Sequence, residues 1–224
     1  MKKVLKNVSF VFLLLKMCIV FGQEMNAQKR IIIDVGHGGK DAGAIGINKI
    51  QEKDIVLDIA NAILKLNKKL GKPLDIYLTR YKDTLISLAD RTKLAKALKA
   101  DLFVSLHCNH SDNPKARGIE VYASKKQEEY SKESVFVGYQ IEKTICEEIG
   151  YESRGVKFAN FQVLRETVDS CPSVLLELGF LSNTDESRYY QNQISYQILA
   201  LALLKSLIKN YNYERAWKRN YQDN

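Results

Sequence analysis

The sequence predicts an α/β domain in three layers, with helices on both faces of a mostly parallel, twisted sheet of about six strands. Two observations predict this fold class. Short runs of β-branched and leucine residues alternate along the chain with longer segments whose apolar residues recur at helical spacing. No internal repeat, linker or low-complexity stretch interrupts this alternation, so the 224 residues predict one domain with a sizeable core.

The elements of the first half follow from local signals. Residues 31–35 are a β-branched run stopped by glycine, which predicts a buried strand. Residues 52–69 carry apolar side chains every three or four positions and predict a helix, which a Gly-Lys-Pro sequence ends. Residues 75–79 predict a second strand. A serine followed three residues later by Asp90 predicts the cap of a helix over 87–99.

The second half continues the alternation. Residues 102–106 and 118–122 predict two further strands, and 131–149 predict a long helix. Residues 161–164 are a weaker apolar run and predict a minor strand, whereas 174–178 are a strong one. The last predicted helix spans 191–210, and its inward face is expected to carry Ile194, Ile198, Leu201, Leu204 and Ile208. A frayed polar tail is expected over 211–224.

The first 27 residues have the pattern of a secretory signal peptide. Three lysines precede an apolar stretch that Lys16 interrupts, and this stretch is too short for a confident membrane span. We expect cleavage after Gly22 or Ala27, leaving a catalytic domain over 28–210 with no integral membrane span. An uncleaved membrane anchor is the alternative. Export implies the periplasm or cell envelope, or the outside of a single-membrane cell.

The excess of positive charge is partly a property of this leader. The whole chain has 34 basic and 26 acidic residues and a formal charge of +8. Cleavage after Ala27 removes four lysines and one glutamate, a net of three positive charges, so +8 becomes +5. No aromatic residues alternate with the remaining basic side chains as a single-strand nucleic-acid groove requires. We therefore expect no nucleic-acid partner. The lysines that we expect on the solvent sides of helices are Lys65, Lys68, Lys69, Lys93, Lys96 and Lys99.

Residues at the predicted strand ends suggest a metal site. His37 follows the first strand within a glycine-rich loop, His107 ends the third, and Glu52 begins the helix after that loop. Ligands in such folds bind at the carboxyl ends of strands, and catalytic zinc commonly takes two histidines and one carboxylate. The alternative is that these are ordinary hydrogen-bonded histidines, and spacing alone does not decide between the two. His110 is a less favoured ligand, because its simplest role is in a surface turn.

Glu177, in the last predicted strand, is then free to act as a general base. Zinc lowers the pKa of water to about 7, and a nearby glutamate can accept the proton. The glycine-rich loop has a competing interpretation as a phosphate cradle. It lacks a following Gly-Lys-Ser/Thr sequence, and Asp41 stands where a dinucleotide loop has its third glycine. A tight turn that exposes His37 fits the glycines better.

Segments along most of the mature chain carry motifs found together in one family. They are 33–44, 52–54, 78–80 with Asp83, Leu88 and Arg91, 105–109, 117–122, 163–165 and 172–183. In this order they resemble the zinc-dependent N-acetylmuramoyl-L-alanine amidases of bacterial cell-wall metabolism, of the amidase-3 type. The resemblance covers about 31–208, and the motifs are highly specific together, although each alone is weak.

This resemblance implies an α/β amidase domain with one zinc ion on His37, Glu52 and His107. It implies Glu177 as the catalytic glutamate and peptidoglycan, with its muramyl stem peptides, as the substrate. Some relatives carry an extra helix that blocks the site until an activator moves it. Since 122–154 holds one predicted helix and little else, we expect an open site and no obligatory activator.

Further polar residues are expected around the centre. Asn109 lies beside a ligand and could hydrogen-bond the stem peptide, or it could cap its own turn. Arg80 and Arg165 could meet stem-peptide carboxylates. Asp34 and Glu120 interrupt apolar strands, so each is expected to have a buried partner and a supporting role, Asp34 by orienting His37. Arg91 is expected to be structural, paired with Asp83 or a helix end.

Two other functions remain open at this stage. One is a different zinc hydrolase on a similar sheet, such as a peptidase or a deacetylase. Products that begin with L-alanine would distinguish an amidase from a deacetylase. The other is a non-catalytic wall-binding module, which retention of all three ligands and Glu177 disfavours.

Overall fold

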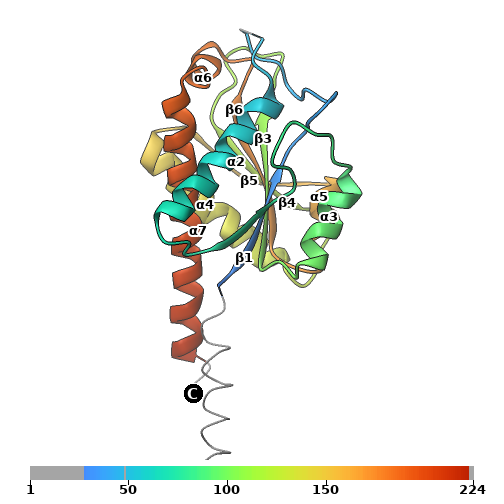
Figure 1. Ribbon diagram of the computed structural model, residues 1–224, viewed down its shortest axis with the longest axis vertical. Helices are drawn as coiled ribbons and strands as arrows, with labels where there is room; N and C mark the ends of the chain where they lie inside the picture. The colour runs from blue at the N-terminus through green and yellow to red at the C-terminus, as the bar shows by residue number, and fades with distance from the viewer. Residues whose placement is uncertain (1–27, 48, 222–224) are drawn as a thin grey trace, which may run out of the picture.

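The computed structural model describes residues 28–47 and 49–221, with side chains as far as Asn212. The expected signal peptide lies outside these residues. The described chain forms a six-stranded sheet in the order β2-β1-β3-β6-β4-β5, with helices on both faces (Figure 1). The strands are β1 (Arg30–Val35), β2 (Asp75–Leu78), β3 (Leu102–Asn109), β4 (Ile119–Ser124), β5 (Ser153–Ala159) and β6 (Ser173–Phe180). The helices are α2 (Glu52–Lys69), α3 (Leu88–Ala97), α4 (Ser131–Ile149), α5 (Gln162–Arg165), α6 (Thr184–Tyr189) and α7 (Gln193–Tyr221).

The strand directions confirm a mostly parallel sheet. Strands β2, β1, β3 and β6 run parallel to one another. Strand β4 is antiparallel to β6, and β5 follows the direction of β4. The carboxyl ends of β1, β3 and β6 therefore lie at the same edge as the first residues of β4 and β5.

The two faces of the sheet are covered unequally. Helices α2, α4 and α7 lie on one side and α3 and α5 on the other (Figure 1). The first three contribute to the main core, in which Ile59, Ile141 and Leu203 are fully buried. A smaller core lies under α3 and α5 and includes Phe103 and Leu175. Alternation along the strands places His107 and Glu177 on this second face, since they lie four residues beyond Phe103 and two beyond Leu175.

Most predicted elements are confirmed, some to the residue. The helices over 52–69 and 131–149 have the predicted bounds. Ser87 is the N-cap of α3, where its hydroxyl accepts a hydrogen bond from the backbone N–H of Asp90. The predicted strand over 161–164 is wrong, because this stretch forms the short helix α5. Strand β5 and helix α6 were not predicted.

The closing helix differs in length and in its buried side. It extends to Tyr221, beyond the expected end at 210. Three residues expected to point inward are exposed: Ile194, Ile198 and Leu201. Leu204 is buried as expected and Ile208 is partly buried against the core. The other buried residues of this helix are Leu199, Ala200, Ala202, Leu203 and Leu207. In the part of the chain that is described, none of the helices is long and apolar enough to cross a membrane.

Candidate metal centre and active site

The three predicted ligands converge on one point at the edge of the sheet. Glu52 Oε1 lies 3.0 Å from His37 Nε2 and 2.9 Å from His107 Nδ1. His37 comes from the loop after β1, Glu52 is the first residue of α2, and His107 lies near the end of β3. One ligand atom from each lies within 4.8 Å of the other two, which is close enough to hold one metal ion.

The chemistry of this group fits zinc. Two imidazole nitrogens and one carboxylate oxygen are a common ligand set for catalytic zinc, and a fourth position stays available for water or substrate. The two histidine rings meet edge to face, with centroids 4.9 Å apart. Glu177 lies beside His107 in the β3–β6 pairing, and its buried Oε2 has no hydrogen-bond partner. A buried carboxylate oxygen without a hydrogen-bond partner, next to three potential metal ligands, is expected where a ligand or water binds.

The loop after β1 takes an unusual path that positions His37. His37, Gly38 and Gly39 all have positive φ, at 56°, 126° and 58°. A Cβ on the preceding Gly36 would lie 2.6 Å from the imidazole Cε1 of His107, so only glycine allows β1 to pass this close to the second ligand. The glycine-rich sequence therefore serves ligand placement, as predicted.

A buried ion pair holds this loop from below. Asp34 and Arg91 are almost fully buried, and Arg91 Nη1 lies 2.7 Å from Asp34 Oδ1. Arg91 Nη2 also donates to the carbonyl of His37 at 2.8 Å. Asp34 further accepts hydrogen bonds from Thr79 and Ser105. Asp34 thus acts on His37 through Arg91. Arg91 is structural as expected, but its ion-pair partner is Asp34, whereas Asp83 or a helix end was expected.

Arg80 does not occupy the expected place in the cleft. Its side chain is buried, and its guanidinium donates to the carbonyls of Val35, Gly36 and Lys53. These bonds join the loop after β1 to the start of α2, so Arg80 supports the ligands His37 and Glu52. The prediction of a substrate contact is corrected here, because these backbone acceptors already engage the guanidinium inside the protein.

Asp41 is a neighbour of the centre that the sequence reasoning missed as a functional residue. Its Oδ2 lies 2.8 Å from His37 Nδ1, the ring nitrogen that points away from Glu52. Burial disfavours protonation of His37, but hydrogen bonds and negative charge from Glu52 and Asp41 outweigh it and raise its pKa to about 9. A carboxylate on the outer nitrogen is the usual device that orients a metal-binding histidine.

Glu52 is ionised although it is buried. Burial raises its pKa, but hydrogen bonds and positive charge from His107 and His37 lower it to about 2. Two backbone N–H groups also donate to the carboxylate, from Ala44 at 2.7 Å and from Cys108 at 3.0 Å. The ligand oxygens therefore have a fixed orientation.

Glu177 has the opposite electrostatic setting. Burial raises its pKa to about 7, with the negative charges of Glu52 and Glu120 adding to the rise and the two histidines opposing it. A carboxylate with a pKa near the working pH can both accept and release a proton. This is the property required of the predicted general base.

Glu120 has polar partners, as its position in an apolar strand predicted, but these partners are partly exposed and not buried as expected. It lies directly opposite Glu177 in the antiparallel β4–β6 pairing. Its carboxylate forms ion pairs with Arg154 and Lys157 and accepts a hydrogen bond from the Tyr122 hydroxyl at 2.7 Å. Burial raises the pKa of Glu120, but the hydrogen bonds from these three side chains outweigh it, and the pKa is lowered.

The other expected contact residues lie around this cluster. Asn109 Nδ2 donates to Glu120 at 3.3 Å, and its Oδ1 accepts from the N–H of His110, so both the cluster and its own turn use this amide. Arg165 is half-buried on α5 and donates to the carbonyl and side chain of Asn160. His110 is not part of the potential metal group. Arg154 and Lys157 were missed, because the strand that carries them was not predicted.

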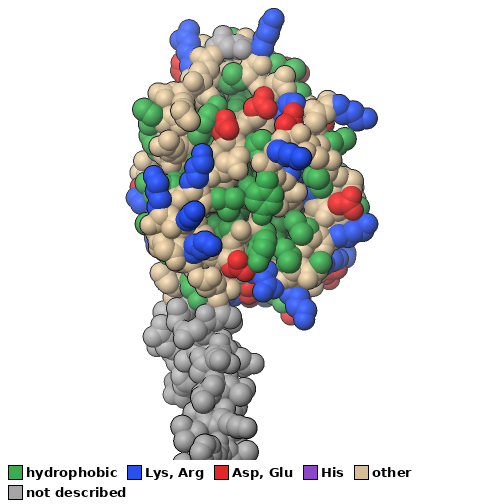
Figure 2. Space-filling view, in the orientation of Figure 1, with side chains coloured by type: hydrophobic (Ala, Val, Ile, Leu, Met, Phe, Trp, Pro, Cys, Tyr) green, Lys and Arg blue, Asp and Glu red, His purple; other side chains and the backbone are tan. Residues whose placement is uncertain are grey.

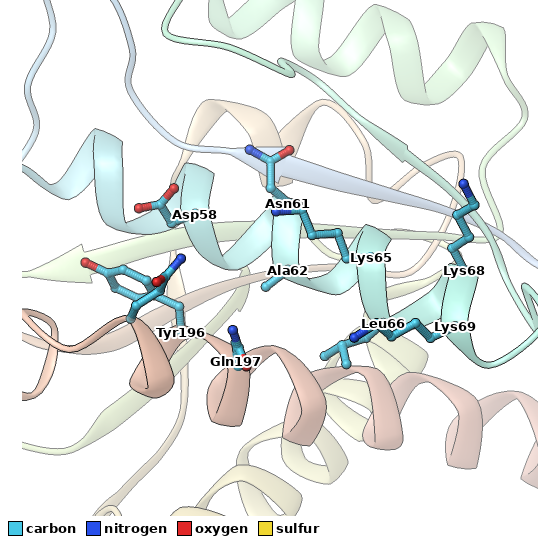
Figure 3. Close-up of a pocket in the computed structure, with 10 residues that line it drawn as sticks. Asp58, Asn61, Ala62, Lys65, Leu66, Lys68, Lys69, Tyr196 and Gln197 are labelled. Atoms are coloured by element: carbon cyan, nitrogen blue, oxygen red, sulfur yellow. The ribbon is translucent and has the colours of Figure 1, made fainter.

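A separate pocket lies away from the candidate metal centre and lacks comparable chemistry. A pocket of about 600 Å³ lies between α2 and α7, lined among others by Asp58, Lys65 and Tyr196 (Figure 3). None of the potential metal ligands lines it.

The lysines predicted on solvent sides of α2 and α3 are all exposed. Basic side chains are spread around the face shown in Figure 2, with apolar side chains at its middle.

Together the fold and the site define a class of protein, an α/β domain with a candidate hydrolytic metal centre at one edge of its sheet. The family model described as N-acetylmuramoyl-L-alanine amidase matches residues 31–209. The chain belongs to this amidase family, as the sequence motifs predicted.

Relatives of known name agree with this assignment. The chain is 34% identical over 182 residues to the N-acetylmuramoyl-L-alanine amidase LytC of Bacillus subtilis, covering 81% of this chain but only 35% of LytC. It is 31% identical over 232 residues to the amidase AmiA of Escherichia coli, covering 85% of this chain and 79% of AmiA.

Solved structures show the same domain. The catalytic domain of the amidase CwlV from Bacillus (Paenibacillus) polymyxa has a TM-score of 0.74 and 34% identity, covering 83% of this chain and 99% of that domain. The CwlD amidase of Clostridioides difficile, solved in complex with the GerS lipoprotein, has a TM-score of 0.75 and 27% identity. It covers 83% of this chain and is itself covered completely.

Proposed function

We propose that this chain is a zinc-dependent N-acetylmuramoyl-L-alanine amidase. It hydrolyses the amide bond that joins the lactyl group of N-acetylmuramic acid to L-alanine in peptidoglycan. One observation carries the proposal: the His37–Glu52–His107 group stands beside the buried Glu177, whose Oε2 has no hydrogen-bond partner. The family assignment supports the choice of bond, and the ligand set supports zinc as the single metal ion.

The residues of the chain divide the work of hydrolysis. His37, Glu52 and His107 would hold the zinc ion, which would supply Lewis-acid polarisation of the carbonyl and lower the pKa of water. Glu177 takes a proton from the attacking water and passes it to the leaving amine nitrogen. Asp41 and Arg91 keep His37 in place, through its outer ring nitrogen and its carbonyl.

Substrate contact is proposed for two further residues. Asn109 lies between the last ligand and Glu120 and retains partial exposure, so its amide can reach the stem peptide. Arg165 is half-exposed at the end of α5 and can meet a stem-peptide carboxylate.

The proposal includes an open site and an exported protein. Between β4 and β5 the described chain contains α4 and no second helix. This supports activity without an obligatory activator, although the CwlD relative was solved with the GerS lipoprotein. The pattern of the first 27 residues and the names of cell-wall relatives support export to the cell envelope.

Digestion of purified peptidoglycan tests the function directly. The protein alone should release stem peptides whose new amino terminus is L-alanine, as identified by mass spectrometry. Removal of metal with a chelator should stop the release, and added zinc should restore it. Release of acetate or cleavage within the stem peptide would point to a deacetylase or a peptidase. No release, combined with retained binding to the wall, would point to a non-catalytic binding module.

A further inference from the structure

Strand β5 contains one residue more than the stretch of β4 that it pairs with. Ile119 pairs with Ser153, whereas Val121 pairs with Val156, so Arg154 and Gly155 together oppose the single residue between the two pairs on β4. Gly155 has a φ of 79°, in the left-handed region. This is a β-bulge, a feature that redirects side chains and is frequent beside active sites.

The bulge is held by a carboxylate on α4. Glu142 is 2% exposed, and its Oε1 accepts hydrogen bonds from the backbone N–H groups of Arg154 at 3.0 Å and Gly155 at 2.7 Å. The hydroxyl of Ser153 donates to the same oxygen at 2.9 Å. A buried acid with all three of these donors gives the bulge a single fixed geometry.

The bulge changes which side chains share a face. In a regular strand, residues three apart point to opposite faces of the sheet. Here Arg154 and Lys157 both reach Glu120 Oε1, through Nε of the arginine and Nζ of the lysine, the latter at 2.7 Å. The Arg154 guanidinium also lies over the ring of Phe180, 4.9 Å from its centroid. The extra residue thus brings two cations together that a regular strand would separate.

These cations lie close to the proposed catalytic glutamate and remain accessible. Glu120, which they both contact, is paired directly with Glu177 across β4 and β6. The side chains of Arg154 and Lys157 are 36% and 39% exposed. Among the described residues both cations share the single carboxylate of Glu120 as their ion-pair partner.

We propose that Arg154 and Lys157 form a subsite for a carboxylate on the peptide part of the substrate. The inference rests on the proposed function and adds to it a determinant of specificity. Both cations meet Glu120 on β4, and β4 is two strands from β3, which carries His107, so they lie roughly 10 Å from the proposed metal position. An extended peptide spans this distance in about three residues. The carboxylate recognised is therefore expected two or three residues from the bond that is cut.

A pair of substrates tests this subsite. Both are muramyl peptides with the same scissile bond, and they differ only in a free carboxylate or a carboxamide two or three residues beyond it. The zinc-loaded wild-type protein should have a kcat/KM about 10- to 100-fold higher for the carboxylate, the range for a charge-assisted hydrogen bond. Lys157→Met should remove most of this preference, so that the ratio of kcat/KM for the carboxylate to that for the carboxamide falls toward one.

Two controls separate recognition from a structural effect. Lys205→Met removes the same charge from an exposed ion pair on α7 and should leave the preference intact. Arg154→Lys keeps the charge and should retain part of it. Equal losses on both substrates for Lys157→Met, or an unchanged ratio, would overturn the inference. If the wild-type protein cleaves neither substrate, it is the proposed function that fails.

Discussion

Replacing Glu177 with glutamine tests the assignment of the general base. The substitution keeps the size of the side chain and removes its ability to accept a proton. General-base catalysis contributes about 10²- to 10⁴-fold, so hydrolysis should fall by that factor, or by about 3–5 kcal/mol of transition-state stabilisation. Binding of zinc and substrate should change much less, because Glu177 is not one of the three ligands.

The same substitution should stabilise the metal-free fold at high pH. Burial raises the pKa of Glu177 from 4.5 to about 7, so the folded state disfavours the ionised carboxyl. Folding stability from this group is full below pH 4.5, falls as the pH rises toward 7 and then levels off. The shift corresponds to about 3 kcal/mol above pH 7, at roughly 1.4 kcal/mol per pKa unit. Glutamine carries no charge and avoids this penalty.

Glu177→Gln is therefore expected to lower hydrolytic activity and to raise folding stability at high pH. Activity is measured by release of muramyl peptides at pH 8, and stability by denaturant unfolding of wild type and Glu177→Gln at pH 4 and pH 8. The free energy of unfolding of the variant relative to wild type should rise by about 3 kcal/mol between the two pH values. Retention of hydrolysis, or a relative stability independent of pH, would refute the reasoning.

Three further predictions concern the metal and its support. The pKa of His37 is raised to about 9 because Glu52 and Asp41 outweigh burial, so zinc must displace a proton below that pH. Its apparent affinity in chelator competition should rise about tenfold per pH unit between pH 7 and 9, and a flat profile would contradict the ligand assignment. Arg91→Met leaves Asp34 buried without its cation and should cost about 3–5 kcal/mol in denaturant unfolding. Lys93→Met, in an exposed pair on the same helix, should cost less than about 1 kcal/mol, and equal costs would disprove the role of Arg91. Gly36→Ala places a methyl group 2.6 Å from the His107 ring and should weaken zinc binding and cost about 1–3 kcal/mol. Gly71→Ala meets no atom within 4 Å and should leave zinc affinity unchanged, so identical zinc affinities for both variants would count against close packing at Gly36.

The central strands and the candidate metal ligands could be predicted from the sequence for the same reason. Strands β1, β3 and β6 are buried on both faces, so they read as continuous apolar runs, and the polar residues that follow them stand out. Glu52 was accessible because it begins a strongly periodic helix. The spacing of these residues did not decide between ligands and ordinary histidines. Their convergence on Glu52 Oε1 depends on contacts distant in the chain.

The edge strand β5 could not be predicted from the sequence. Residues 153–159 contain two cations and a glycine, show apolar alternation only at Val156 and Phe158, and lie on an edge strand with little burial. The run at 161–164 was mistaken for a strand because four residues are too few to display helical periodicity. In α7, Ile194, Ile198 and Leu201 have the spacing of a buried stripe, but a second stripe through Leu199 and Leu203 packs on the core. Tertiary packing alone selects between two such stripes.

Because β5 lies at the edge of the sheet, mutations that alter substrate preference can occur separately from mutations that alter the metal site. The proposed metal ligands and general base lie in the loop after β1 and on α2, β3 and β6, whereas β5 pairs only with β4 among the described strands. Its bulge is held by one acid on α4, Glu142. Residues 152–159 can therefore be exchanged together with Glu142. Such an exchange can alter substrate preference and leave the geometry of the proposed metal ligands unchanged. Changes of preference in this family of domains are expected to accumulate at this rim faster than in β1, β3 and β6.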